Sequence, residues 1–302
     1  MATTLSLPGP VLRGADAQLA SLLFSDSGAA SAFSAPPGEP ALAAPESVSW
    51  AVFKNPLTVF IGGVAAVLLE LADPRVRSGV WQHTTFREKP LQRLQRTGWA
   101  AMMTVYGPRT RAEAMIGRVA HLHEGVRGVT PAGVAYQASD PALLEWVHAT
   151  ACFGILQAHG SYVEPITEAR CDAFYAEAQT AARLYGVRDP PGSQAAVLEL
   201  FKDRHAGLEP SDVVIEFLQI VKRMPALPAM LRPVQGWLVD AAVAIVPADL
   251  RHRLGLGGAL APWQRRLVSR AAAAADRLVL PSHPAVQACR RLGLADDYLY
   301  RR

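Results

Sequence analysis

The segment LTVFIGGVAAVLLELA, which follows Asn55 and Pro56, most constrains how this chain can fold. Asn55 is a residue type that caps the first turn of a helix, and Pro56 suits the first helical position. The helix that follows is apolar on almost all sides, and such a helix is normally buried. Gly62 and Gly63 in its middle allow a neighbouring helix or a flat ligand to approach closely. We therefore predict a central buried helix.

Helical patterns also account for the rest of the folded region. Apolar residues recur at helical spacing in roughly ten segments that Gly and Pro separate. No segment alternates apolar and polar residues convincingly enough to predict a sheet strand. We therefore predict an all-α fold in a single helical domain at residues 48–302. Residues 1–47, rich in Ala, Ser, Pro and Gly, are predicted to form a partly flexible N-terminal arm.

Charge, cysteine content and apolar runs set the expected class of protein. The net charge of +4 comes mainly from arginines, and no basic run with interleaved aromatic residues is present, so we expect no nucleic-acid partner. Three cysteines without C-x-x-C spacing favour a reducing compartment. We find no export signal, and the apolar run Pro56–Leu69 has 14 residues, fewer than the roughly 20 that span a bilayer. We therefore expect a cytoplasmic protein without a transmembrane segment.

A second well-defined helix starts at Asp140 and Pro141 and can run to about Gly160. Residues 124–140, which lead into it, are long for a loop, and long loops inside a compact domain often serve a site. The centre of the helix is His148, which shares one face with Leu144, Ala151, Cys152 and Ile155. Its imidazole is therefore expected to point into an apolar interior. A buried histidine is more often a core residue than a ligand, so both roles stay open.

Motif searches exclude several chemistries. The chain lacks the glycine-rich nucleotide motifs, G-x-S-x-G and H-E-x-x-H. Glu145 and His148 form an E-x-x-H pair, the motif that di-iron carboxylate bundles use twice. The motif occurs only once in this chain, so a di-iron site is a less favoured interpretation of Glu145 and His148.

Two more histidines lie close together in the sequence. His121 and His123 are two residues apart, so they point to different sides of a regular helix and cannot chelate one metal jointly. Arg118 and Arg127 flank them. Buried arginines commonly hold carboxylates such as porphyrin propionates, and a solvated surface position is the alternative for each.

Three blocks, in this order and spacing, carry a family resemblance: GGVAAVLLELADPRVRSGVWQHTTFREKPLQRLQRTGWAAMMTVYG, RVAHLHEGVRG and YQASDPALLEWVHAT. The chain resembles the DUF2236 family, whose characterised members are the latex-clearing rubber oxygenases and the fungal MpaB-type oxygenases. The resemblance covers about residues 50–292. It implies a globin-like all-α core with additional helices, haem b as cofactor, and dioxygen-dependent cleavage of a carbon–carbon double bond in an isoprenoid chain.

The resemblance also implies roles for single residues. The histidine of the W-V-H-A block, the proximal iron ligand, falls on His148. Arg118 and His123 match the R-V-x-x-x-H block, and His83 falls in the G-V-x-x-H block. We expect Arg118, with His121 or His123, to act on iron-bound dioxygen. Arg127 and His83 are predicted, with Arg118, to bind the haem.

One departure from the family narrows the range of substrates that we expect. Rubber oxygenases can place a lysine on the distal face of the haem, and this chain has no lysine between Lys89 and Lys202. The chain therefore looks more like the MpaB-type branch, which acts on smaller molecules. We predict a haem b-dependent oxygenase that acts on an apolar small molecule. The alternatives are another haem-dependent oxidation (hydroxylation, peroxidation or coupling) and a non-catalytic haem sensor or carrier.

Overall fold

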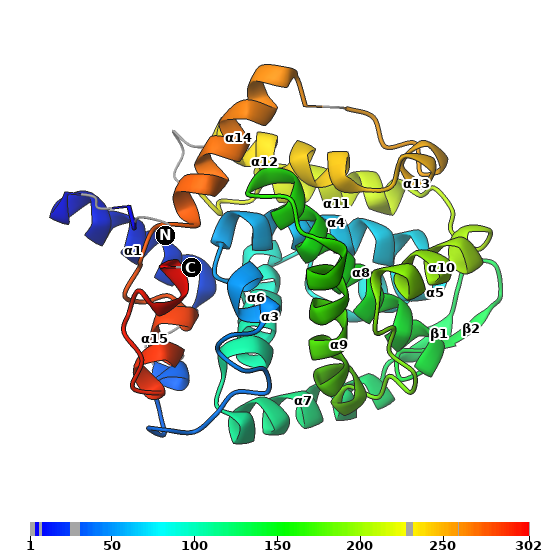
Figure 1. The fold of residues 1–302 in the computed structure, drawn as a ribbon. Coiled ribbons are helices and arrows are strands. Elements are labelled where there is room, and N and C mark those ends of the chain that lie inside the picture. Colours follow the sequence, from blue (N-terminus) through cyan, green and yellow to red (C-terminus); the bar gives the residue numbers. More distant parts are fainter. Residues whose placement is uncertain (1–3, 6–7, 25–30, 228–231, 259, 302) are drawn as a thin grey trace.

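The computed structural model describes residues 4–5, 8–24, 31–227, 232–258 and 260–301 (Figure 1). This part of the chain forms fourteen α-helices and one short two-stranded sheet, which confirms the predicted all-α class. The helices are α1 (Gly9–Leu23), α3 (Val48–Phe53), α4 (Pro56–Ala72), α5 (Pro74–His83), α6 (Pro90–Tyr106), α7 (Arg109–Glu124), α8 (Pro141–Tyr162), α9 (Glu168–Leu184), α10 (Gln194–His205), α11 (Asp212–Arg223), α12 (Arg232–Ile245), α13 (Ala248–Arg253), α14 (Pro262–Ala275) and α15 (Pro284–Arg291). Short 3-10 turns lie at Ser31–Phe33 and Tyr298–Tyr300.

Helix α4 is the central element, as its sequence predicts. The Asn55 side chain caps it by accepting hydrogen bonds from the amides of Leu57 (3.1 Å) and Thr58 (3.2 Å). Helix α8 packs along α4, and their backbones meet where Gly62 faces Gly154. Helices α11, α12 and α14 cover other sides of α4. Figure 1 shows α4 and α8 in the middle of the molecule, with α12 and α14 above them and α7 along the lower edge.

Two apolar cores hold these layers together. The larger surrounds α4 and α8 and extends to α9, α11 and α12. The smaller lies between α6, α7, α15 and the 3-10 turn at Ser31–Phe33. Phe53 and Val59 pack against both cores, so the two cores belong to one continuous body.

A buried polar network anchors the start of α4. Lys54, with 7% of its side chain exposed, forms an ion pair with Asp276 (2.9 Å). The same ammonium donates to the carbonyl oxygens of Asp276 (3.0 Å) and Leu299 (3.2 Å). The second carboxylate oxygen of Asp276 lies 3.7 Å from Nε2 of His159 at the end of α8. The network therefore ties α4, α8, the end of α14 and the 3-10 turn at Tyr298–Tyr300 together.

The sequence did not predict the two short strands. β1 (Arg127–Val129) pairs antiparallel with β2 (Ala135–Gln137), with Gly128 opposite Tyr136. Each strand has three residues, which is too short for an alternating pattern to stand out. The hairpin occupies the segment expected to be a loop, and the buried Tyr136 ring holds it against α5 by donating to Gln82 (2.9 Å).

Part of the predicted N-terminal arm packs on the body. Helix α1 lies against α6, and Oδ1 of Asp16 accepts from the Ser282 amide (2.8 Å). The Phe33 side chain is fully buried, and the Arg291 guanidinium donates to its carbonyl oxygen (2.5 Å). Residues 1–3, 6–7 and 25–30 of the predicted arm lie outside the described residues.

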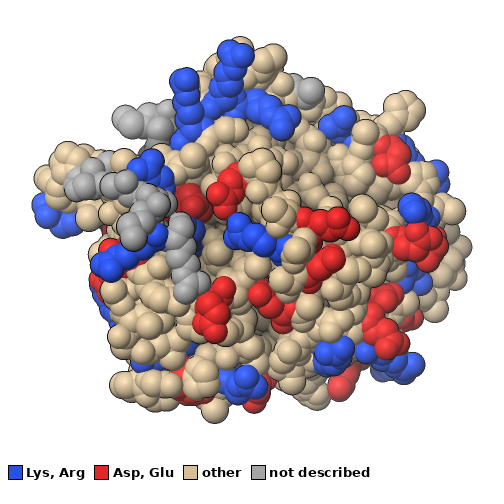
Figure 2. Space-filling view, in the orientation of Figure 1, with Lys and Arg blue, Asp and Glu red and all other residues tan. Residues whose placement is uncertain are grey.

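The surface and the helix lengths complete the description. Figure 2 shows side chains of both charges interspersed over one face, with Lys and Arg gathered at the top, where α14 lies. Among the described helices none is long and apolar enough to cross a membrane by itself, and the one combination that qualifies, α4 with α5, is bent by 110°.

Candidate functional site

His148 lies in the middle of α8, where the sequence places it. The Asp140 side chain caps this helix by accepting from the Ala142 amide (2.8 Å), and Pro141 follows at the first position. Burial lowers the pKa of His148 to about 4, so the ring is neutral near pH 7. Its hydrogen-bond contacts among the described residues are with the Cys152 sulfur, 3.7 Å from Nε2 and 3.9 Å from Nδ1. A thiol is a weak partner, so the ring nitrogens remain available to a ligand.

The face of α8 that carries His148 differs from the rest of the helix. Four of its residues are only half-buried, namely Leu144, Val147, His148 and Ala151, whereas Cys152 and Ile155 further along it are buried, as are Trp146 and Thr150 on the opposite face. Partial exposure along one face of an interior helix indicates space beside it.

Helix α4 has a matching half-buried stripe, formed by Val59, Phe60, Gly63, Val67 and Glu70. Gly63 shows the space directly. A Cβ atom on Gly63 would have no neighbour within 4 Å, whereas a Cβ atom on the adjacent Gly62 would lie 2.6 Å from the Gly154 carbonyl oxygen. One side of the central helix therefore borders open space.

The two stripes lie on the same side of the helix pair. Helices α4 and α8 run antiparallel, because Gly62 meets Gly154 while the carbonyl oxygen of Leu69 accepts from the Trp146 indole (3.2 Å). When both helices are viewed from the same end, successive residues advance around the two antiparallel helices in opposite senses. Gly63 and His148 are turned by similar angles from the contact between Gly62 and Gly154, so they point to the same side of the helix pair. His148 therefore faces the space that Gly63 borders.

Three titratable side chains on three helices are linked by electrostatic effects: Arg93 of α6 affects both Glu70 of α4 and His123 of α7. Burial raises the pKa of Glu70 to about 7, against the opposing effect of Arg93. Burial also lowers the pKa of Arg93, which Glu70 counteracts. Burial and the nearby Arg93 charge together lower the pKa of His123. Charge effects weaken with distance, so Glu70 and His123 both lie within electrostatic range of Arg93.

His123 has an unused nitrogen. Its Nδ1 atom is buried and has no hydrogen-bond partner among the described residues. A buried polar atom without a partner is uncommon and indicates a ligand, water or ion that would complete it. The His123 ring is neutral in this environment, so it can also serve as a metal ligand.

The other residues predicted for the site lie on the surface. Arg118, His121, Arg127 and His83 are all exposed. His121, 83% exposed, contacts Glu124 (3.1 Å), and Nε2 of His83 lies 3.2 Å from the Tyr136 hydroxyl. The structure thus turns His123 and His148 inward and leaves these four outside, where their roles stay predictions.

Glu145 also faces away from His148. Its carboxylate lies 3.8 Å from Nη2 of Arg204, which donates to the carbonyl oxygen of Ala142 (2.6 Å). Within the described residues no three His, Cys, Asp or Glu side chains are grouped so as to hold a metal ion. A haem iron needs few protein ligands, because the porphyrin supplies the others.

The sequence analysis did not predict that Glu70 and Arg93 belong to the candidate site. Glu70 is the one charged residue in the apolar run of α4, and a buried acid in such a helix is a recognisable sign of a site. Arg93 is one of two arginines in the segment RLQR, and nothing in the spacing separates the inward one from the exposed Arg96.

Comparison with known proteins gives a family match and two relatives. Residues 50–277 match the family described as ER-bound oxygenase mpaB/B'/rubber oxygenase, catalytic domain. The uncharacterized proteins Mb2261 of Mycobacterium bovis and Rv2237 of Mycobacterium tuberculosis are each 29% identical over 178 residues, 57% of this chain and 70% of theirs. No solved structure matches the chain significantly.

Proposed function

Because the chain belongs to the family of mpaB-type and rubber oxygenase catalytic domains, we propose that it is a haem b-dependent oxygenase. The observation that supports haem is the space beside α4 and α8. Gly63 leaves room there for a flat group, and the neutral imidazole of His148 faces it. The second inward imidazole, His123, has a free nitrogen. When bound, haem supplies the binding and activation of dioxygen, which no side chain can supply.

Two histidines are available to the iron. The family resemblance implies His148, and the unpartnered Nδ1 of His123 supports His123. Both rings are held neutral by burial, which is the state that binds a metal. We propose that one of the two would bind the haem iron and that the other would border the cofactor or the substrate.

Arg93 and Glu70 supply charge and proton transfer in this proposal. Arg93 keeps a positive charge in the interior and can pair with a propionate or with negative charge that develops on oxygen. With a pKa of about 7, the Glu70 carboxyl can give up or accept a proton near neutral pH. The proposal therefore assigns to Arg93 the cationic role that the sequence suggested for the exposed Arg118.

The substrate we propose is an apolar olefin. Val59, Phe60 and Val67 of α4 line the same half-buried stripe as Gly63 and offer an apolar surface to it. In oxidative cleavage of a carbon–carbon double bond by dioxygen, each carbon takes one oxygen atom and becomes a carbonyl group. Atoms and electrons balance without an external reductant.

The first experiment is an absorption spectrum of protein expressed with added haem precursor. The proposal expects a Soret band, and protein that binds no haem under these conditions would overturn it. His148→Ala and His123→Ala are then compared, and the variant of the axial ligand should lose or strongly shift the band. His121→Ala, at an exposed imidazole, is the matched control and should keep the band unchanged.

The second experiment tests the reaction. Haem-loaded protein is incubated with squalene under dioxygen, and carbonyl products are trapped with a hydrazine reagent and identified by mass spectrometry. Cleavage products that carry oxygen-18 from labelled dioxygen support the proposal. A hydroxylated product in their place would establish a different haem-dependent oxidation.

A further inference from the structure

Two open hollows meet at Pro90 on the surface of the molecule. The first, of about 470 Å³, lies between the start of α6 and the last two turns of α11. The second, of about 720 Å³, lies between α1, α6 and the turn that follows α11. Pro90 lines both, so the two hollows adjoin at this residue.

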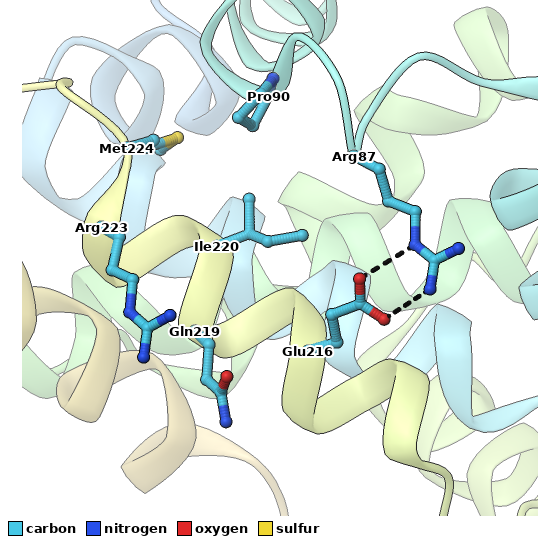
Figure 3. Close-up of a pocket in the computed structure, with 7 residues that line it drawn as sticks. All are labelled: Arg87, Pro90, Glu216, Gln219, Ile220, Arg223 and Met224. Atoms are coloured by element: carbon cyan, nitrogen blue, oxygen red, sulfur yellow. Dashed lines mark hydrogen bonds and ion pairs between the residues drawn. The ribbon is translucent and has the colours of Figure 1, made fainter.

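The first hollow has an apolar side and a polar side. Glu216, Gln219, Ile220 and Arg223 follow one another at helical spacing, so they share the face of α11 that lines the hollow. Figure 3 shows Ile220 directed toward Pro90, with Met224 beside them, and Gln219 and Arg223 on the opposite side. An occupant between Ile220 and Pro90 would therefore meet carbon, and the polar ends of Gln219 and Arg223 would lie at the rim.

One arginine of the hollow is already neutralised. Nε and Nη2 of Arg87 donate to the two carboxylate oxygens of Glu216 (2.9 Å and 2.8 Å). This bidentate contact also lowers the pKa of Glu216, so the carboxylate stays charged. Arg87 and Glu216 therefore neutralise each other and are not available to bind a charged ligand.

Arg223 is in a different position. Its exposed guanidinium forms no hydrogen bond or ion pair with any described residue, and the same is true of the Lys89 ammonium in the second hollow. Glu88, the acid next to Lys89 in the sequence, lines neither hollow. A cation without a partner beside an apolar wall is complementary to an amphipathic anion.

The second hollow supplies the apolar continuation. Phe24, Leu91 and Pro225 line it, and Phe24 is nearly fully buried beneath the surface. A chain of carbon atoms that starts beside Arg223 can pass over Pro90 and lie against these three residues. Such a ligand would bury apolar surface along its whole length while its charged end remains at the rim.

We propose that the two hollows form one groove that binds an alkyl-chain carboxylate, with its head group on Arg223 and its apolar chain across Pro90. The groove borders the first turn of α6, the helix that carries Arg93 inward. The binding of the carboxylate is independent of the function proposed above. Its role as a substrate or product of the oxygenase rests on that function.

Isothermal titration calorimetry of the purified protein with laurate and with dodecanol tests the groove. Laurate is expected to bind at least about tenfold more tightly, because only the carboxylate can pair with Arg223. Arg223→Ala should weaken laurate binding by about tenfold or more and leave dodecanol unchanged, and Arg223→Lys should recover part of the loss. Ile220→Glu should weaken both ligands.

The control is Arg188→Ala, at an exposed arginine between α9 and α10, which should bind laurate like the unmodified protein. Equal binding of laurate and dodecanol, or unchanged laurate binding by Arg223→Ala, would overturn the groove. Circular dichroism of each variant shows whether it is folded. The two proposals fail separately, because laurate binding is measured with or without haem and the Soret band is measured without laurate.

Discussion

Gly62 of α4 and Gly154 of α8 touch through their backbones. A Cβ atom on Gly62 would stand 2.6 Å from the Gly154 carbonyl oxygen and equally close to Cα of Ile155, and the reverse substitution would be tighter still. Real Cβ atoms do not approach backbone so closely, and backbone cannot move aside as a flexible side chain can. This contact sets the separation of the two central helices and therefore the width of the space on which Gly63 borders.

Substitution of the two adjacent glycines should have opposite effects on stability. Gly62→Ala forces α4 and α8 apart and is expected to lower the free energy of unfolding by about 2–3 kcal/mol. Gly63→Ala meets no atom within 4 Å and is expected to raise it by about 0.5–1 kcal/mol, because alanine favours the helix. Urea unfolding of cofactor-free protein measures both values. Equal effects of the two substitutions would contradict the close contact.

A larger side chain at Gly63 should exclude the cofactor without unfolding the protein. Gly63→Leu places its side chain in the open space beside α4. If haem occupies this space, its retention should fall by about tenfold or more, whereas Gly63→Ala should keep most of it. Soret absorbance after gel filtration measures retention, and circular dichroism checks the helix content. Full haem retention by a folded Gly63→Leu variant would place the cofactor elsewhere.

The central helices were predictable because their signals are local. Asn55 and Asp140 cap the helices that the sequence assigns to them, and the apolar run after Pro56 has no other place than the interior. The hairpin was missed because strands of three residues carry no pattern of their own. Its position depends on the buried ring of Tyr136.

The interior cluster was only partly predictable. Helical spacing gives the angle between two residues on one helix, but it does not give the direction in which that helix is turned. His121 and His123 were therefore known to diverge, while the choice of His123 as the inward ring depends on how α7 packs. Glu70 and Arg93 come from different helices, so their proximity follows from tertiary packing alone.

The raised pKa of Glu70 predicts a pH dependence of stability. With a pKa near 7 in the folded protein and the ordinary value of about 4.5 when unfolded, the folded state binds more protons between these values. The stability contributed by protonation is complete below pH 4.5 and is lost as pH rises through 7. Glu70→Gln, which is neutral throughout, should therefore be more stable than the unmodified protein at pH 8 by roughly 2 kcal/mol and similar at pH 4.5.

Urea unfolding of cofactor-free protein at several pH values between 4.5 and 8 checks this difference. Glu199→Gln, at an exposed carboxylate paired with Lys202, is the matched control and should follow the unmodified protein. A Glu70→Gln variant with the same pH profile as the unmodified protein would show that the pKa of this carboxyl is not raised by folding.

Lys54 should matter far more to stability than an exposed lysine with an equally short ion pair. Lys54→Ala leaves the Asp276 carboxylate and two carbonyl oxygens without their ammonium partner, at an expected cost of about 3 kcal/mol in unfolding free energy. Lys202→Ala breaks a 2.7 Å pair with Glu199 at the surface, where solvent screens both charges, and should cost far less. Chemical denaturation of both variants compares them, and similar losses would argue against a dominant role for the buried network.

The partners of Lys54 are synthesised late in translation. The carbonyl oxygens that accept from its ammonium lie 222 and 245 positions further along the sequence. A ribosome therefore releases α4 long before it has synthesised the partners that anchor the beginning of that helix. Until Asp276 and then Leu299 have been made, the ammonium of Lys54 lacks these partners, so the anchoring of the central helix is completed only with the last part of the fold.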